Sequence, residues 1–132
     1  MISKDISLVV NKANDTDFDE EQLKSAPDSF FNSIFVSDVL ELSNDDKVLD
    51  NVLSKVKKSG VIKLSGMDGI EMCRRVYFGE IPIEASSDFF AQSKRINSLT
   101  SIRTELEKRG YKVLFAGVDA GRYLVEAKQN VN

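Results

Sequence analysis

The chain lacks histidine and tryptophan, and it has one cysteine and two prolines among its 132 residues. The single cysteine, Cys73, excludes an internal disulfide and is typical of proteins in a reducing compartment, so we expect a cytoplasmic location. With no histidine to activate its thiol, Cys73 is predicted to be a small core residue rather than a nucleophile. All seven glycines lie at or after Gly60, so the first part of the chain has no glycine-rich turn.

The sequence also has no long apolar run and no basic block. A membrane-spanning helix needs roughly 20 apolar residues, and no run in this chain approaches that length. Met1–Asp5 lacks the apolar core of a signal peptide. The formal net charge is -3 and the sequence pI is about 5.0. These features predict a protein that binds neither membranes nor nucleic acid.

An acidic segment near the amino terminus has part of the spacing of a calcium-binding loop. Asp15, Asp17 and Asp19 alternate as the first ligands of such a loop do. Glu20 stands at the sixth position, which needs glycine, and Ala26 stands at the twelfth, which needs a bidentate glutamate. No metal site is therefore predicted, and we expect a solvated loop or the start of a helix.

The stretch 32–68 organises the chain. Its apolar runs Ile34–Val36 and Val61–Leu64 are predicted strands, and apolar residues at helical spacing lie between them. These helical positions are Val48, Leu49, Val52, Leu53 and Val56. Ser43 is a candidate N-cap and Gly60 a candidate helix stop. Strand, helix and strand with short joints predict a right-handed crossover with parallel strands, and hence an α/β domain.

The flanking segments predict further elements from apolar spacing, β-branched residues and turn residues. In chain order they are a strand at Ile6–Val10, a helical turn at Glu20–Ser25, a helix across Gly66–Gly79, a connection at Glu80–Ser98, a helix at Thr100–Arg109, and two hairpin strands at Tyr111–Phe115 and Arg122–Ala127. Gly110 is placed to end the last helix with a left-handed cap.

Two motifs follow one another in the central stretch. The first is Ser33–Leu42, SIFVSDVLEL, and the second is Val56–Asp68, VKKSGVIKLSGMD. They resemble the fourth strand of class I S-adenosylmethionine-dependent methyltransferases, D-x-I-x-x-x-H-V-L-E-H, and the later V-L-K-P-G-G-x-L-x-I-x-x-P-D run of that family. Pro27–Phe30 resembles the P-D-x-S-F/V-D run that leads into the same strand. The resemblance covers about residues 27–128 and only the carboxyl-terminal half of the family's domain.

This resemblance implies a fold and a domain organisation. The fold is an α/β, truncated Rossmann-like methyltransferase sheet with parallel strands, a carboxyl-terminal antiparallel hairpin and helices on the faces. The chain 1–132 is then a single truncated domain, in which 1–26 supplies a strand and an acidic loop and 27–128 is the family-like region. The family holds S-adenosylmethionine with a glycine-rich turn after its first strand, and nothing here matches that D/E-x-G-x-G-x-G turn. S-adenosylmethionine is the implied cofactor, but its usual binding loop is missing.

The resemblance also implies candidate site residues. The cofactor-binding candidates are Ser37 and Asp38, and the substrate-binding candidates are Ser65, Asp68, Phe89 and Phe90. Glu41 is a further candidate polar contact, and no residue is assigned as a catalytic base. Two plainer interpretations stay open: Ser37 and Asp38 end a strand and cap a turn, and the two phenylalanines pin their connection to the core.

Loss of the family's first half would expose the edge of the apolar strand Ser33–Leu40. Ile6–Val10, a second copy of the chain or another protein could cover this edge. The leading hypothesis is therefore a non-catalytic or regulatory methyltransferase-like subunit that acts through oligomer or partner contacts, with a phage genome as one candidate source. One alternative is an active methyltransferase whose site is completed by oligomerisation. A second alternative is a small-molecule binding module that uses the carboxyl ends of the strands.

Overall fold

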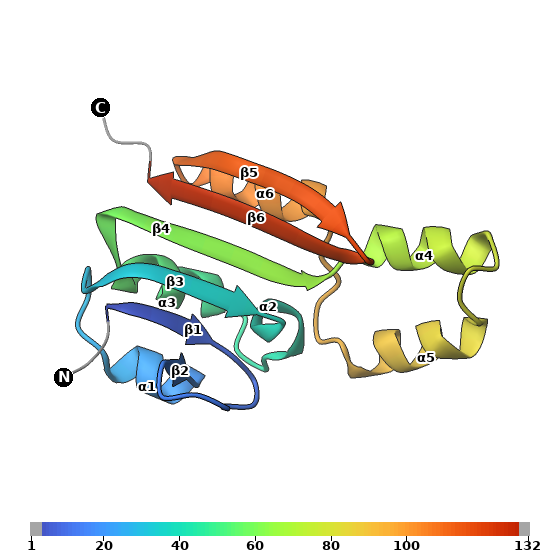
Figure 1. The fold of residues 1–132 in the computed structure, drawn as a ribbon, viewed down its shortest axis with the longest axis horizontal. Coiled ribbons are helices and arrows are strands. Elements are labelled where there is room, and N and C mark those ends of the chain that lie inside the picture. Colours follow the sequence, from blue (N-terminus) through green and yellow to red (C-terminus); the bar gives the residue numbers. More distant parts are fainter. Residues whose placement is uncertain (1–3, 130–132) are drawn as a thin grey trace.

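Six strands form one mixed sheet in the part of the chain that the computed structural model describes, residues 4–129 (Figure 1). The strands are β1 (Asp5–Leu8), β2 (Asp17–Phe18), β3 (Phe31–Ser37), β4 (Val56–Met67), β5 (Tyr111–Asp119) and β6 (Arg122–Gln129). Their order across the sheet is β2-β1-β3-β4-β6-β5. The first four are parallel, and β6 runs antiparallel to both β4 and β5. The predicted α/β fold class is confirmed.

The helices cover one face of this sheet and extend beyond one end of it. They are α1 (Glu20–Ser25), α2 (Val39–Leu42), α3 (Val48–Lys55), α4 (Gly69–Tyr77), α5 (Ile83–Gln92) and α6 (Leu99–Lys108). Figure 1 shows α3 and α6 behind the strands, whereas α4 and α5 project past the strand ends. None of the helices in residues 4–129 combines the length and the apolar character that a membrane span requires.

The core lies between the sheet and the helices behind it. Ile34 and Val36 of β3 and Ile62 and Leu64 of β4 are completely buried, because alternate residues of a strand point to the same face. Ile102 of α6 packs against them in the same cluster. The predicted strands and the helical connection between them are confirmed as β3, α3 and β4, with β3 and β4 parallel.

The opposite face of the sheet carries no helix from the described residues. We call it the open face, and its outward residues include Phe35, Val61, Lys63, Lys112, Phe115 and Lys128. Parallel sheets with helices on both faces have almost continuous apolar strands. Here serine and lysine alternate with the buried residues, so this sequence suits a sheet that is covered on one face.

The edge of β3 is covered within the chain. β1 pairs with it in parallel, with Ile6 opposite Ile34 and Leu8 opposite Val36. This pairing is one of the three arrangements that the sequence left open. It protects the apolar strand without requiring a partner at that edge.

Two local predictions in the central crossover are wrong. Lys47, not Ser43, occupies the N-cap position of α3, and Ser43 is the C-cap of α2. Gly60 lies inside β4 and does not end the helix. A Cβ at position 60 would lie 2.7 Å from the carbonyl oxygen of Asn32, beside an irregularity in the pairing of β3 with β4. Gly60 is therefore explained by close backbone approach rather than by a helix cap.

Two predictions beyond β4 also need correction. Cys73 is exposed rather than a core residue, because α4 projects past the sheet and its apolar spacing has no core to face. The segment 80–98 contains the helix α5, with Pro82 at its N-cap position, and is not only a connection. The predicted helix and hairpin that follow are confirmed as α6, β5 and β6.

Candidate functional site at the carboxyl ends of the strands

Three of the predicted site residues meet where β3 and β4 end. Ser37 is paired with Ser65 across the two parallel strands, and the Asp38 amide donates a hydrogen bond to the Ser65 carbonyl (2.9 Å). Asp38 has φ 66°, in the left-handed region, which a short polar residue tolerates better than most others. The turn after β3 therefore fixes both side chains at the edge where open α/β sheets usually bind ligands.

Arg122 completes this group, and sequence reasoning missed it. Its Nη2 forms an ion pair with Asp38 Oδ1 (3.0 Å), with both side chains about one-third exposed, and donates to Ser65 Oγ (3.4 Å). Arg122 reaches this edge because antiparallel β6 begins opposite Met67. The turn between the two hairpin strands was the signal that could have located Arg122 beside the strand ends.

Glu41 lies behind this group and is buried. Its Oε2 accepts hydrogen bonds from Tyr123 Oη (2.7 Å) and Asn97 Nδ2 (2.6 Å), and its backbone carbonyl accepts one from the Lys94 amide (2.7 Å). Burial raises the pKa of the Glu41 carboxyl, and the two side-chain hydrogen bonds oppose this effect. Burial and the neighbouring carboxylate also raise the pKa of Tyr123. Through its hydrogen bonds to Asn97, just before α6, and to Tyr123 of β6, Glu41 links these two segments of the chain.

Asp68 is buried and serves as a helix cap. Its Oδ1 accepts a hydrogen bond from the Glu71 amide in the first turn of α4 (2.9 Å), and its Oδ2 accepts one from the Leu99 amide at the start of α6 (2.8 Å). One carboxylate thus satisfies amides at two helix amino termini, where negative charge is favourable. The structure gives Asp68 this structural role and does not join it to the group of Ser37, Asp38 and Ser65.

Phe89 and Phe90 lie on α5, outside the hydrophobic core. Their ring centroids are 5.0 Å apart in an edge-on arrangement, and Phe90 is 43% exposed. The interpretation that they pin a connection to the core does not fit this position. They belong instead to the projecting part of the molecule.

The link between β1 and β2, residues 9–16, stands where the first strand of the sheet ends. It contains no glycine, and its backbone is tied to β2 and its flanks. Asp17 Oδ2 accepts hydrogen bonds from the Ala13 and Asn14 amides (2.8 and 2.9 Å), and the Val9 amide donates to the Phe18 carbonyl (3.0 Å). These amides are already used within the protein.

The side chains of this site are hydrogen-bonded or ion-paired with one another. Asp38 is paired with Arg122, and Glu41 Oε2 is occupied by two donors. Glu41 Oε1 has no hydrogen-bond partner but is fully enclosed. The exposed part of the site can therefore offer a carboxylate, a guanidinium and two serine hydroxyls for polar contacts with a ligand.

Comparisons with known proteins identify the fold. No family model and no curated protein sequence matches the chain. Among solved structures, DhpI in complex with SAH matches with a TM-score of 0.57 and 13% identity over 89% of this chain and 57% of that chain. A SAM-dependent methyltransferase from Thermotoga maritima, described as a possible histamine N-methyltransferase, matches with a TM-score of 0.57 and 14% identity. The match covers 86% of this chain and 62% of that chain. An S-adenosylmethionine-dependent methyltransferase from Mesorhizobium loti matches with a TM-score of 0.57 and 13% identity. The match covers 89% of this chain and 72% of that chain.

These similarities concern the fold, since the identities are low. The chain spans less than two thirds of the length of the DhpI and Thermotoga maritima proteins. It has the Rossmann-like α/β fold of S-adenosylmethionine-dependent methyltransferases, over part of the length of those enzymes.

Proposed function

We propose that this protein is a methyltransferase-like subunit that does not catalyse methyl transfer and acts through contacts with another protein chain, in the cytoplasm. On this proposal it corresponds to the carboxyl-terminal half of the methyltransferase domain and lacks the glycine-rich cofactor loop. β1 and β2 then replace the missing half only as far as needed to cover the edge of β3.

The link 9–16 carries this proposal. A backbone that cradles a ligand needs glycines for close approach and free amides that point at the ligand. This link has no glycine, and Asp17 occupies the Ala13 and Asn14 amides. Binding a cofactor here in the family's manner would first require these hydrogen bonds to break.

The alternative is an active S-adenosylmethionine-dependent methyltransferase or a small-molecule binding module. One observation favours a ligand at the strand ends: Asp38 is held in a left-handed conformation beside the partly exposed Arg122. Strained backbone at a strand end is a reason to look for a function. DhpI binds SAH on the same fold, which makes SAH the probe to use.

The experiment is a titration of the ¹⁵N-labelled protein with S-adenosylhomocysteine and with S-adenosylmethionine, followed by amide chemical shifts and by calorimetry. Our proposal expects no saturable shifts in residues 9–16 or at Ser37 and Asp38. A dissociation constant of about 100 µM or tighter, near -5.5 kcal/mol, with shifts at these residues would overturn it. Asp38→Ala should then weaken binding, whereas Asp28→Ala should not, since the exposed Asp28 carboxylate pairs with Lys55 before β3 begins and lies outside the strand-end group.

A further inference from the structure

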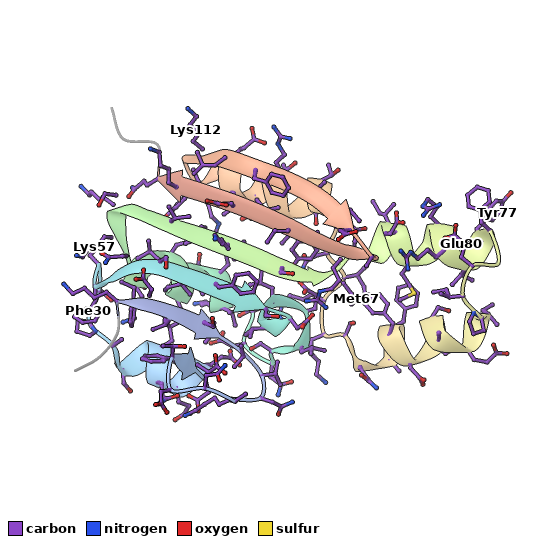
Figure 2. All side chains as sticks on the ribbon, viewed as in Figure 1. Phe30, Lys57, Met67, Tyr77, Glu80 and Lys112 are labelled. Carbon is purple, nitrogen blue, oxygen red and sulfur yellow. The ribbon has the colours of Figure 1, made fainter. Side chains whose placement is uncertain are left out.

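α4 and α5 form a helical hairpin that we call the arm, residues 69–92. Figure 1 shows the arm continuing past the strand ends instead of packing on the sheet, and Figure 2 shows Tyr77 at its tip. The arm exposes several large apolar side chains. They are Ile70 (66% exposed), Tyr77 (83%), Phe78 (65%), Ile83 (65%) and Phe90 (43%). Exposed apolar groups gathered on one projection indicate a contact surface.

The open face of the sheet is the complementary feature. Phe115 is 53% exposed there, and a shallow groove of about 360 Å³ on this face is lined by Phe35, Val61 and Lys63 among others. The protein thus has two helices without a sheet beneath them and a sheet face without helices over it. Packing one on the other would give each the layered arrangement that such elements adopt in folded domains.

The charges of α5 and of most charged residues on the open face are opposite in sign: α5 carries Glu84 and Asp88, and the open face carries Lys63, Lys112 and Lys128 together with Glu126, which lines the same groove. On α5, Glu84 and Asp88 lie at i,i+4 spacing, and neither forms an ion pair with a described residue. On the open face Lys112 stands directly opposite Lys128 across β5 and β6, also without an ion-paired carboxylate in residues 4–129. Like charges in either arrangement repel. Contact between the surfaces would relieve both repulsions.

We propose that the partner is a second copy of this chain, and that the arm of each copy packs on the open face of the other about a two-fold axis. The arrangement is reciprocal, so it closes as a dimer and does not continue as a filament. The projecting arm cannot fold back on its own sheet without a change at the junction of β4 and α4, where Asp68 caps α4. A second copy meets no such constraint.

The dimensions agree with this arrangement. α5 has ten residues, which is about 15 Å of helix, and about 15 Å corresponds to four or five residues along a strand. That length spans β4 from Ser65 back to Val61, whose row across the sheet holds Lys128 of β6 and Lys112 of β5, and it passes the row of Lys63, Glu126 and Phe115. The exposed apolar side chains of the arm offer on the order of 500 Å². Each copy contributes both an arm and an open face, which reaches the roughly 800 Å² per partner of a stable interface.

This inference deepens the proposed function, because it names the chain whose contacts the proposal requires. The two can fail separately. Binding of S-adenosylhomocysteine is read from shifts at the strand ends, whereas self-association is read from mass. A dimer that binds the ligand would overturn only the non-catalytic proposal, and a monomer that does not bind it would overturn only the dimer.

Sedimentation equilibrium and light scattering test the dimer. Wild-type protein at about 50 µM, well above the Kd of a micromolar complex, should have twice the 14.7 kDa mass of the chain. An arm variant, Phe78→Asp with Ile83→Asp, and a face variant, Lys63→Glu with Phe115→Asp, should each be monomeric. Circular dichroism checks that both are folded. Val10→Asp is the matched control, since Val10 is 52% exposed outside both surfaces, and it should remain dimeric.

Mixing the two monomeric variants identifies the contact. The face variant keeps an intact arm and the arm variant keeps an intact open face, so the mixture should form a heterodimer through one interface, detected by native mass spectrometry. Dimers built from arm against arm or sheet against sheet would not be restored in this way. A monomeric wild type, a dimeric arm variant or a mixture that stays monomeric would each overturn the proposal.

Discussion

The carboxyl group of Glu41 fills the space that a side chain at Gly66 would take. A Cβ at position 66 would lie 1.8 Å from Oε1 of Glu41 and 3.0 Å from the hydroxyl of Tyr123. Glu41 can therefore bridge Tyr123 and Asn97 only because β4 has no side chain at this point. The glycine is explained by a buried carboxyl group and not by an unusual backbone angle.

Gly66→Ala is expected to lower the free energy of unfolding by about 2–3 kcal/mol, through overpacking and the loss of hydrogen bonds to Glu41. Urea unfolding measures this loss. Gly117→Ala in β5 is the control, because the added Cβ would meet only the ring edge of Phe115 at 3.2 Å. If both substitutions lower the free energy of unfolding by the same amount, the Glu41 carboxyl does not explain the glycine at position 66.

The raised pKa of Glu41 predicts a dependence of stability on pH. As the pH rises above the ordinary glutamate pKa of 4.5, the unfolded chain loses its proton before the folded chain does. The contribution of Glu41 to the free energy of unfolding therefore falls with rising pH until the folded carboxyl is also ionised. Glu41→Gln stays neutral, so its stability relative to wild type should improve as the pH rises above 4.5, until the folded carboxyl is also ionised.

Urea unfolding of both proteins at several pH values checks this prediction. Glu21→Gln is the control, since Glu21 is exposed on α1, outside both proposed contact surfaces, and should show no such change. A difference between wild type and Glu41→Gln that is constant with pH would mean that burial does not favour the protonated carboxyl.

Asp68→Ala is expected to destabilise the protein by about 2–3 kcal/mol, because two helix amino termini lose the carboxylate that caps them. Asp19→Ala provides the matched comparison. Asp19 caps only α1, where it accepts from the Gln22 amide, and its loss should cost about 1 kcal/mol. Guanidinium unfolding measures both variants. If Asp68→Ala and Asp19→Ala lose the same free energy of unfolding, then Asp68 does not stabilise two helix amino termini.

The sequence predicted those elements whose signals are local. Apolar spacing located β3, β4 and α6, and Gly110, with φ 82°, ends α6 in the left-handed conformation expected of it. The helical spacing of α4 was also correct, but Cys73 was wrongly placed in a core. A periodic pattern shows which side of a helix is apolar and does not show whether any element of the same chain covers it.

The candidate site was predictable only in part for a similar reason. Ser37, Asp38 and Ser65 come together because parallel neighbours end at the same edge of a sheet. Arg122 and Tyr123 reach that edge from an antiparallel strand far along the chain, and the register of that strand depends on the whole hairpin. Asp68 resembled a ligand contact in the motif, but its hydrogen bonds to α4 and α6 depend on a packing that no local pattern describes.

Asp38 allows the cost of a left-handed residue to be separated from that of its ion pair. Asp38→Gly and Asp38→Ala both remove the pair with Arg122, which contributes little because it is partly exposed. Only alanine adds the backbone penalty, so Asp38→Ala should be about 1 kcal/mol less stable than Asp38→Gly in urea unfolding.

Ala120 supplies the converse test, since it already has φ 52° in the turn between β5 and β6. Ala120→Asn should stabilise the protein by about 0.5–1 kcal/mol, because Asn-Gly is the favoured pair for such a two-residue turn. Ala120→Asn could stabilise the hairpin while Asp38→Gly and Asp38→Ala have the same free energy of unfolding. In that case the left-handed conformation of residue 38 carries no strain. The conformation of Asp38 would then cease to favour a ligand at the strand ends.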